Sequence, residues 1–491
     1  MNEHDLAQIS DLALNRPEND PAIEYDRHWF SWGGLKGVAN RISELIEASG
    51  AKPGSRIALV ARNRPSAIAA YLGLLQQRRA VRMVYPFQSA AALARDLEAI
   101  APAVVIAAEG DFQEDVLKLL ESQGIAAIAL SEMDAHALPS LEKTQNRGPL
   151  APHPQLEILT SGTTGTPKPF ALDYDTVARH IVSAGAAAGV DPAQLPPAVM
   201  FFPVGNITGL HSCIAPLLRG QRGVLFDRFS VEGWHDHLVR FRPTAGGLPP
   251  AGLQMILDAD LPREDFSSLK MIGTGSAPLD PSVQRAFEER YGVPIILAYG
   301  ATEFGGPVAG MSLELHAQWG DKKRGSVGKA YPGASLRVVD AETGEELPAG
   351  EEGALEVISP RIGPQWIRTS DIAVIDEDGF LFLRGRADGA IMRGGFKILP
   401  ETIEKALRLH PAVAAVGVVG VPDHRLGQVP AAAVQLKPGA TDPSFTELEA
   451  HLRQHVPATH IPVHWLYVSE LPRTPSYKVN QPALRELFET V

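Results

Sequence analysis

Cysteine is nearly absent from this chain. Cys213 is the only one in 491 residues, so no internal disulfide can form, and a reducing compartment is expected. Cys213 lies in the apolar run 213–218, which favours a buried thiol over a nucleophile. No apolar run is long enough to cross a membrane, and the first residues lack the basic and apolar regions of a signal peptide. We therefore expect a soluble, cytoplasmic protein.

An excess of positive charge is also missing. The chain has 45 Lys and Arg residues against 57 Asp and Glu residues, which gives a net charge of −12. Because an acidic chain binds nucleic acid poorly, we expect no nucleic-acid partner. The content of 45% hydrophobic and 21% charged residues is ordinary for a globular protein, and the length predicts at least two domains. The oligomeric state stays open between a monomer and a homodimer.

Short apolar runs alternate with helical patterns in the first part of the chain. Strands are expected at 56–60, 104–108 and 125–130, and a helix at 66–75. Continuous apolar strands separated by helices predict an α/β fold with mainly parallel sheets covered by helices. Residues 334–384 contain short runs separated by turn residues, which predict a smaller β unit. A helix from Pro400 and a strand at 413–421 predict a small α+β unit over residues 389–491.

Residues 158–170 are the most informative stretch. The apolar residues Ile158 and Leu159 end as a strand would, and a loop of hydroxyls, glycines and one cation follows: Thr160, Ser161, Gly162, Thr163, Thr164, Gly165 and Lys168. Glycines let backbone N–H groups point inward, and hydroxyls and lysine bind phosphate oxygens. The spacing is not that of a Walker loop. On composition alone, a polyphosphate site and a polar turn fit about equally well.

This loop resembles the phosphate loop of the adenylate-forming superfamily, which includes acyl- and aryl-CoA synthetases, peptide-synthetase adenylation domains and luciferases. Four further motifs follow in the order typical of that superfamily, at 299–303, 366–371, 385–398 and 471–479. The resemblance covers nearly the whole chain. It implies a large adenylation domain over residues 1–385, a hinge at 386–388 and a small mobile C-terminal domain over residues 389–491.

The resemblance also implies a nucleotide site. Tyr299 would stack on adenine, Asp371 would accept the ribose hydroxyls, and Arg386 would add a ribose contact. The turn Gly275, Ser276, Ala277 and Pro278 would form another wall of the adenine site, beside Gly300 and Ala301. Asp371 follows Ser370, where the superfamily usually has glycine.

The implied catalytic residues are Thr302, Glu303 and Lys478. Thr302 would donate to the α-phosphate of ATP, and Glu303 would bind Mg²⁺, a metal that prefers oxygen ligands. Lys478 would stabilise charge during adenylation. The residue before this lysine is usually glycine, but here it is Tyr477, which would be strained if the position requires a positive φ.

Residues for the second half-reaction and for the acid are implied as well. Asp388 matches the hinge, and Gly394, Gly395 and Phe396 match the turn along the CoA tunnel. The acid pocket is expected at Asn206, Gly247, Leu248, Gly273 and Gly305. Glycines leave room for a bulky apolar acid, although neighbouring side chains can also fill that room. Asn206 stands at the usual gate position, and nearby His211 fits a structural histidine better than a gate.

Together these features predict an AMP-forming carboxylic acid:CoA ligase that uses ATP, Mg²⁺ and CoA. One alternative is an acyl-adenylate ligase that loads a separate carrier protein. Another is a nucleotide-binding homologue without catalysis, which the departures at Asn206, Ser370 and Tyr477 keep open. The identity of the acid stays open.

Overall fold

The protein is described here by a computed structural model covering residues 5–145, 148–159, 169–183, 190–394, 396–474 and 477–489. The chain forms two compact units. Unit 1 comprises Met1–Gly247, Met255–Ile272 and Gly300–Gly306, and unit 2 comprises Leu248–Gln254, Gly273–Tyr299 and Pro307–Val491.

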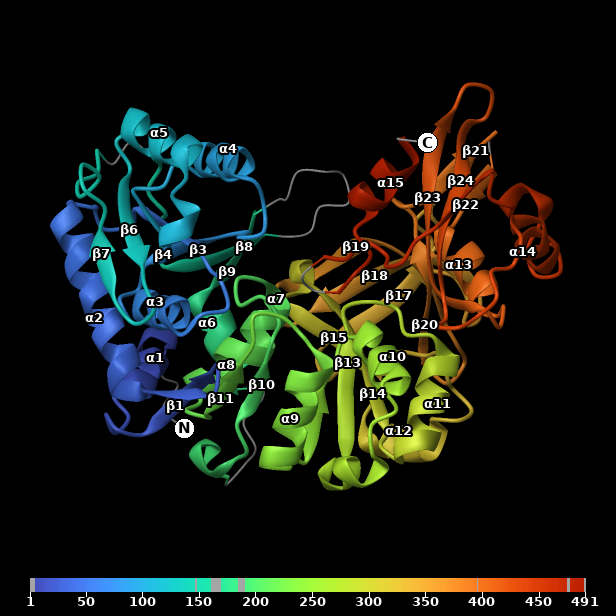
Figure 1. Cartoon of the computed structure of the whole chain (residues 1–491), viewed down its shortest axis with the longest axis horizontal. Helices are drawn as coiled ribbons and strands as arrows, with labels where there is room; N and C mark the ends of the chain where they lie inside the picture. Colours follow the sequence, from blue (N-terminus) through green and yellow to red (C-terminus); the bar gives the residue numbers. More distant parts are fainter. Residues whose placement is uncertain are drawn as a thin grey trace. The chain divides into compact units, whose positions relative to one another are not determined.

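A seven-stranded sheet lies in the first part of unit 1, and most of its strands are labelled in Figure 1. Its strand order is β7-β6-β5-β3-β4-β8-β9, with bounds β3 (Arg56–Val60), β4 (Ala80–Val84), β5 (Val104–Ala108), β6 (Ala126–Leu130), β7 (Ala135–Ala137), β8 (Gln155–Leu159) and β9 (Pro169–Asp173). The five central strands are parallel, and the edge strands β7 and β9 pair antiparallel. The predicted parallel sheet and its expected strands are therefore confirmed.

Both faces of this sheet are buried. Ile57 and Leu59 pack in one apolar core with helices α2 (Trp32–Ser49) and α3 (Pro65–Gln76). Ala58 and Val60 point to the other face and pack with α4 (Ala90–Ile100) and α5 (Glu114–Gln123). Burial on both faces explains why the strand sequences are continuously apolar rather than alternating.

Unit 1 also contains a four-stranded sheet of order β10-β11-β1-β2. Its strands are β1 (Pro21–Tyr25), β2 (His28–Ser31), β10 (Ala198–Met200) and β11 (Gly223–Leu225). The helices are α1 (Leu6–Leu14), α6 (Tyr174–Val177), α7 (Ile207–Gly209), α8 (Ala215–Leu218) and α9 (Val231–Phe241). Cys213 lies buried in the core here, as predicted.

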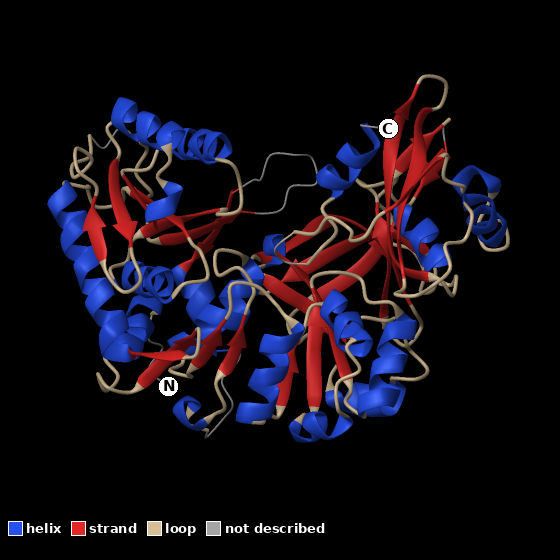
Figure 2. Cartoon of the chain, in the orientation of Figure 1, coloured by secondary structure: helices blue, strands red, loops and turns tan. Residues whose placement is uncertain are grey.

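A five-stranded sheet of order β12-β13-β14-β15-β16 occupies the middle of the sequence. Strands are red and helices blue in Figure 2. Its strands are β12 (Ala245–Gly247), β13 (Met271–Gly275), β14 (Ile295–Ala301), β15 (Gly306–Gly310) and β16 (Lys329–Ala330). The helices of this segment are α10 (Pro250–Asp258), α11 (Pro281–Tyr291) and α12 (Leu313–Trp319). Several predicted motifs follow directly after these strands.

The predicted β unit is confirmed as a four-stranded antiparallel sheet in unit 2. Its order is β17 (Ser335–Val339), β18 (Glu352–Ser359), β19 (Gly363–Ile375) and β20 (Leu381–Arg386). Asp371 on β19 and Arg386 on β20 are cross-strand partners. The strand register therefore places these two predicted nucleotide residues side by side.

The last part of unit 2 is an α+β unit with its own cores. Its strands are β21 (Ile391–Arg393), β22 (Phe396–Ile398), β23 (Val413–Asp423), β24 (Gly427–Leu436) and β25 (His464–Tyr467). One face of the central pair β23–β24 packs against α13 (Pro400–Arg408) and α14 (Phe445–Leu452), and the other packs against α15 (Gln481–Glu489). Among the described residues, no helix is both long and apolar enough to span a membrane.

Candidate active site

Tyr299 and Asp371 meet in unit 2. Tyr299 lies near the end of β14, and its hydroxyl donates a hydrogen bond of 2.5 Å to Oδ2 of Asp371 on β19. The phenol is 8% exposed, and burial, followed by the charge of Asp371, raises the pKa of Tyr299 well above its usual range. The hydroxyl therefore remains a donor over the whole range in which an enzyme is assayed.

The Asp371 backbone is held by a neighbour on its own strand. The N–H of Asp371 donates to Oγ1 of Thr369 at 3.0 Å, and that hydroxyl donates to the carbonyl of Leu355 on β18. Irregularities in the β18–β19 and β19–β20 ladders accompany this segment. Side-chain hydroxyls thus fix the backbone where the regular ladder is interrupted.

Arg386 lies beside this carboxylate and holds the predicted hinge residue. Its Nε is 4.0 Å from Oδ1 of Asp371. Its guanidinium donates to both oxygens of Asp388, at 3.0 and 2.9 Å, and to Oγ of Ser370 at 2.5 Å. Ser370, which departs from the superfamily pattern, therefore adds a hydrogen bond to Arg386 that glycine would lack.

The predicted adenine turn follows β13. Gly275 lies against β14, since a Cβ there would be 2.5 Å from the carbonyl oxygen of Ala298. Ser276 has a φ of +67°, in the left-handed region that favours glycine. Ala277 and Pro278 follow and lead to Asp280, whose carboxylate caps α11 through the N–H of Ser282. The close approach to the strand explains the glycine at position 275.

In unit 1, Thr302 and Glu303 lie in a single helical turn, Thr302–Phe304, directly after Gly300 and Ala301. The turn ends at Gly305, which has a φ of +68° and donates its N–H to the carbonyl of Thr302. Phe304 is buried, whereas Glu303 is exposed. The anchored turn therefore leaves the Glu303 side chain exposed. The predicted phosphate loop at 160–168 lies outside the described residues.

A histidine packs against the end of this turn. Nε2 of His211 is 3.2 Å from the carbonyl oxygen of Gly305, and a Cβ on Gly306 would be 2.2 Å from the same nitrogen. The imidazole therefore fills the space that Gly306 leaves. At this glycine a neighbouring side chain, and not a bulky acid, occupies the room. Asn206 caps the short helix α7, because its side chain accepts the N–H of Gly209 at 2.7 Å.

The other predicted pocket residues lie on or beside β12 and β13. The carbonyl of Gly247 accepts Nε1–H of Trp234, and a Cβ on Gly247 would have no described atom within 4 Å. In unit 2, the N–H of buried Leu248 donates to the carbonyl of Gly273, and Thr274 donates its hydroxyl to the carbonyl of Leu248. Leu248 and Gly273 are therefore brought together.

Lys478 lies in a tight turn near the end of the chain. Its N–H donates to Oγ1 of Thr474, its carbonyl accepts the N–H of Thr474, and its side chain is exposed. Tyr477 has a φ of +61°, so the condition under which a tyrosine would be strained is met at this position. Arg473 donates to the carbonyl of Tyr477 and pairs with Val479 across the turn.

Several apolar side chains are exposed on and beside the hairpin that contains the predicted CoA residues. Gly394 has a φ of +56° and donates its N–H to the carbonyl of Leu426. Phe396 is 61% exposed, Met392 is 50% exposed and Leu426 is 36% exposed. Gly395 lies outside the described residues.

Sequence reasoning missed two kinds of contact. It gave no role to Thr369, and it treated Glu401 only as an acidic residue in the first turn of a helix. Glu401 is in fact largely buried, and burial raises the pKa of its carboxyl to about 7.

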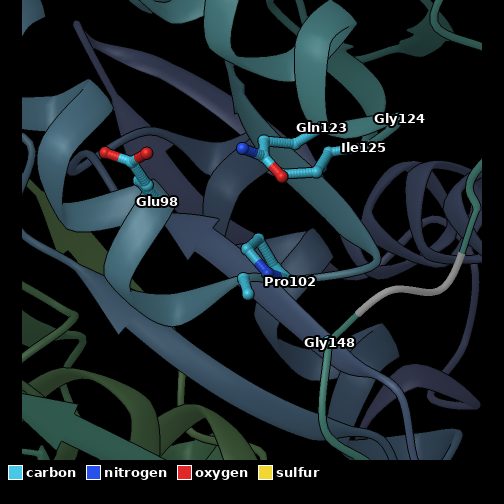
Figure 3. Close-up of a pocket in the computed structure, with 7 residues that line it drawn as sticks. Glu98, Pro102, Gln123, Gly124, Ile125 and Gly148 are labelled. Carbon is cyan, nitrogen blue, oxygen red and sulfur yellow. The ribbon is translucent and has the colours of Figure 1, made fainter.

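A cavity of about 70 Å³ lies in unit 1 (Figure 3). None of the residues that line it belongs to a predicted motif: Glu98, Ala101, Pro102, Gln123, Gly124, Ile125 and Gly148.

Comparisons with known proteins identify the family. The AMP-binding enzyme family matches residues 11–365, and the AMP-binding enzyme C-terminal domain matches residues 402–478. The chain is 30% identical to the indoleacetate–CoA ligase of Aromatoleum aromaticum over 98% of each chain. It is 26% identical to the fatty acid–[acyl-carrier-protein] ligase ScoC of Streptomyces coeruleorubidus, over 98% of this chain and 96% of that one.

The chain belongs to the AMP-binding enzyme family. The crystal structure of ATP-bound MatB from Rhodopseudomonas palustris has the same fold, with a TM-score of 0.80, 23% identity and coverage of 98% of this chain and 99% of that one. The predicted fold class is confirmed. The predicted enzyme class, an AMP-forming ligase that joins a carboxylic acid to a thiol, is confirmed as well.

Proposed function

We propose that this enzyme adenylates a bulky apolar carboxylic acid, branched, alicyclic or aryl, and transfers the acyl group to CoA. The observation that carries the proposal is the meeting of Tyr299, Asp371 and Arg386 in unit 2, because they come from three separate sequence motifs. An aromatic face, a carboxylate and a guanidinium in one place match the adenine and ribose of a nucleotide.

Each remaining nucleotide residue takes one role. The loop 160–168 binds the β- and γ-phosphates, and Thr302 donates to the α-phosphate. Lys478 neutralises the charge that develops at the α-phosphate as pyrophosphate leaves. The exposed side chain of Lys478, in a turn anchored by Thr474, supports this role, since a preorganised cation stabilises a transition state without reorganising.

Glu303 would bind Mg²⁺. No group of three or more His, Cys, Asp or Glu residues suited to a metal exists among the described residues. One exposed carboxylate on an anchored turn fits Mg²⁺, which often takes one carboxylate and completes its shell with phosphates and water. When bound, the ion would offset the negative charge of the phosphates.

The C-terminal unit, residues 389–491, rotates about a hinge at 386–388 between the two half-reactions. Its separate apolar cores support its movement as one body. In this structure Arg386 donates a hydrogen bond to the Asp388 carboxylate. Nε of Arg408 on α13 donates to Oδ2 of Asp280 at 3.2 Å. Rotation would have to release both contacts.

CoA is the proposed acceptor thiol. Gly394 and Phe396 would line the pantetheine tunnel, and the exposure of the apolar Phe396 side chain supports its being covered by a ligand at some stage of the reaction. The carrier-protein alternative is less favoured, although the relative ScoC is named for such an acceptor. Consumption of CoA thiol in the presence of acid and ATP distinguishes the two.

The acid is proposed to be bulky because Gly247 has room for a side chain, whereas Gly306 faces His211. A relative named for indoleacetate, an aryl acid, supports the same class. The oxygen of Asn206 is engaged by Gly209, so a polar contact from Asn206 to the acid would use the amide NH₂ group as donor.

The size argument is tested with Gly247→Leu and a panel of acids of graded width. We expect kcat/KM for wide acids to fall more than for narrow ones. Gly110→Leu is the matched control, because Gly110 also has no described atom within 4 Å of its Cβ and belongs to no motif. Equal losses for all acids would remove Gly247 from the pocket.

Exchange of labelled pyrophosphate into ATP tests the whole proposal, because it requires adenylation and no acceptor. Exchange should depend on added acid, and Lys478→Ala should slow it by about 10²–10³-fold. Thioester formation from supplied acyl-adenylate should change much less. Absence of acid-dependent exchange with every acid of a broad panel would contradict the proposed function.

The hinge is tested by comparing Asp388→Ala with Asp388→Pro. Both remove the pairing with Arg386, but only proline also fixes φ near −65°. We expect pyrophosphate exchange in both variants and loss of thioester formation in the proline variant alone. Full thioester turnover in Asp388→Pro would show that the hinge lies elsewhere.

A further inference from the structure

The hydroxyl of Tyr299 makes a hydrogen bond that stacking on adenine does not require. A phenylalanine ring would offer the same face to a base. The hydroxyl instead reaches another strand and donates to Oδ2 of Asp371 at 2.5 Å. It is nearly buried, so this contact is largely protected from water.

The same hydrogen bond restricts the Asp371 carboxylate. Rotation about the last torsion of an aspartate is soft, so an exposed carboxylate takes a broad range of orientations. Asp371 has a side chain that is 21% exposed, and its backbone is fixed through Thr369. With Oδ2 engaged by Tyr299, the acceptor positions of Oδ1 have one preferred direction before any ligand arrives.

We propose that Tyr299 is a positioning residue whose hydroxyl sets the orientation of the Asp371 carboxylate for the two hydroxyls of the nucleotide ribose. The inference rests on the nucleotide site of the proposed function and adds to it a source of selectivity for ribose. Orienting a group in advance lowers the conformational entropy lost on binding. The same side chain thereby links recognition of the base, by its ring, to recognition of the sugar, by its hydroxyl.

Arg386 acts on the other side of the carboxylate but cannot replace Tyr299. Its nearest approach to Asp371 is 4.0 Å, beyond hydrogen-bond distance, and its donors are directed to Asp388 and Ser370. Arg386 therefore stabilises the Asp371 carboxylate by its charge, whereas the hydrogen bond from Tyr299 sets the orientation of that carboxylate. This difference separates the expected effects of the two side chains.

The test is the binding of ATP and of 2′,3′-dideoxy-ATP to the full-length protein, measured by calorimetry with Mg²⁺ and without acid. In Tyr299→Phe the ring stays and the hydroxyl is lost. We expect ATP to bind about tenfold more weakly, the usual scale for a hydrogen bond to a charged group, and the dideoxy analogue to change by less than about twofold.

Tyr71→Phe is the matched control. Its phenol is fully buried, and its hydroxyl has no hydrogen-bond partner among the described residues. We expect both affinities to be unchanged in that variant. A role for Tyr299 in folding alone would weaken both nucleotides by the same factor, and a role of the ring alone would leave both unchanged. Either result would overturn the inference.

Asp371→Asn tests the pair from the other side, because its amide oxygen still accepts the Tyr299 hydroxyl. We expect this variant to lose affinity for ATP but not for the dideoxy analogue, and Tyr299→Phe to add less than about twofold in its background. Independent, multiplying losses would contradict the coupling. Because no acid is present, these results do not depend on whether the ligase reaction itself occurs.

Discussion

We expect Glu401, at the start of α13, to make the stability of the C-terminal unit depend on pH. Its Oε2 atom is buried with no hydrogen-bond partner among the described residues, and a Cβ on Gly385 would lie 2.7 Å from it. Burial is the main reason that the carboxyl pKa rises to about 7, and the nearby Glu404 raises it further. Backbone N–H groups and Arg386 oppose this rise but do not cancel it.

The direction of the effect follows from proton uptake. The unfolded chain has a carboxyl pKa near 4.5, so between pH 4.5 and about 7 the folded state binds more protons than the unfolded state. The free energy of unfolding therefore falls as pH rises through this window. The stabilisation by the protonated group is complete below pH 4.5 and is lost above about 7, and the two pKa values correspond to about 3 kcal/mol.

Glu401→Gln removes the titration and keeps the shape of the side chain. We expect the variant to match the wild type near pH 5 and to exceed its stability at pH 8 by about 2–3 kcal/mol. Hydrogen exchange of peptides from α13, measured by mass spectrometry on both proteins at each pH, reports the opening of this unit. Comparison at equal pH cancels the intrinsic pH dependence of exchange.

Glu486→Gln is the control, since Glu486 is an exposed carboxylate on α15 of the same unit. It removes the same charge without burial and should leave the pH dependence of exchange as in the wild type. A difference between Glu401→Gln and the wild type that stays constant from pH 5 to 8 would refute the reasoning. So would a Glu401→Gln variant that is less stable at pH 8.

Three further outcomes are expected. Tyr477→Gly relieves a left-handed φ of +61° and should raise the urea midpoint by the equivalent of up to about 1 kcal/mol, whereas a lower midpoint would show that the tyrosine ring contributes more than its backbone costs. Gly306→Ala, with a φ of +121° and a Cβ 2.2 Å from His211, should cost at least about 2 kcal/mol, while Gly247→Ala should stay within about 0.5 kcal/mol; equal melting shifts would contradict this. Cys213 is buried with its thiol pKa raised to about 12, so it should not react with a disulfide reagent until urea unfolds the chain, and rapid labelling of the native protein would be the opposite result.

The regular parts of this fold could be predicted because burial leaves a direct trace in the sequence. Strand β3 is apolar at every position from Ile57 to Val60, and this pattern arises because helices cover both faces of its sheet. Strand β23 was predicted from its apolar run, and helix α13 from the helix start at Pro400. Patterns of this kind depend only on residues that are close in the sequence, so they can be recognised in a single sequence.

Contacts between distant residues could not be predicted in the same way. The superfamily resemblance gave roles to Tyr299 and Asp371, but neither residue type indicates that the phenol donates to that carboxylate. Glu401 has the sequence context of an ordinary acidic residue in a first helical turn, and its burial depends on Gly385 in a separate strand. The burial and the hydrogen bonds of such side chains depend on residues that are distant in the sequence, so a short stretch of sequence does not predict them.

The three departures from the superfamily pattern bear on whether the site is active, because a homologue that has lost catalysis should lose the contacts of its site as well. Ser370 instead adds a donor–acceptor contact to Arg386, and Asn206 caps α7. Tyr477 has a left-handed φ of +61°, a conformation that is costly for a tyrosine. Among the described residues, the departures at Ser370 and Asn206 therefore make contacts of their own, which weakens the case for a homologue that has lost catalysis.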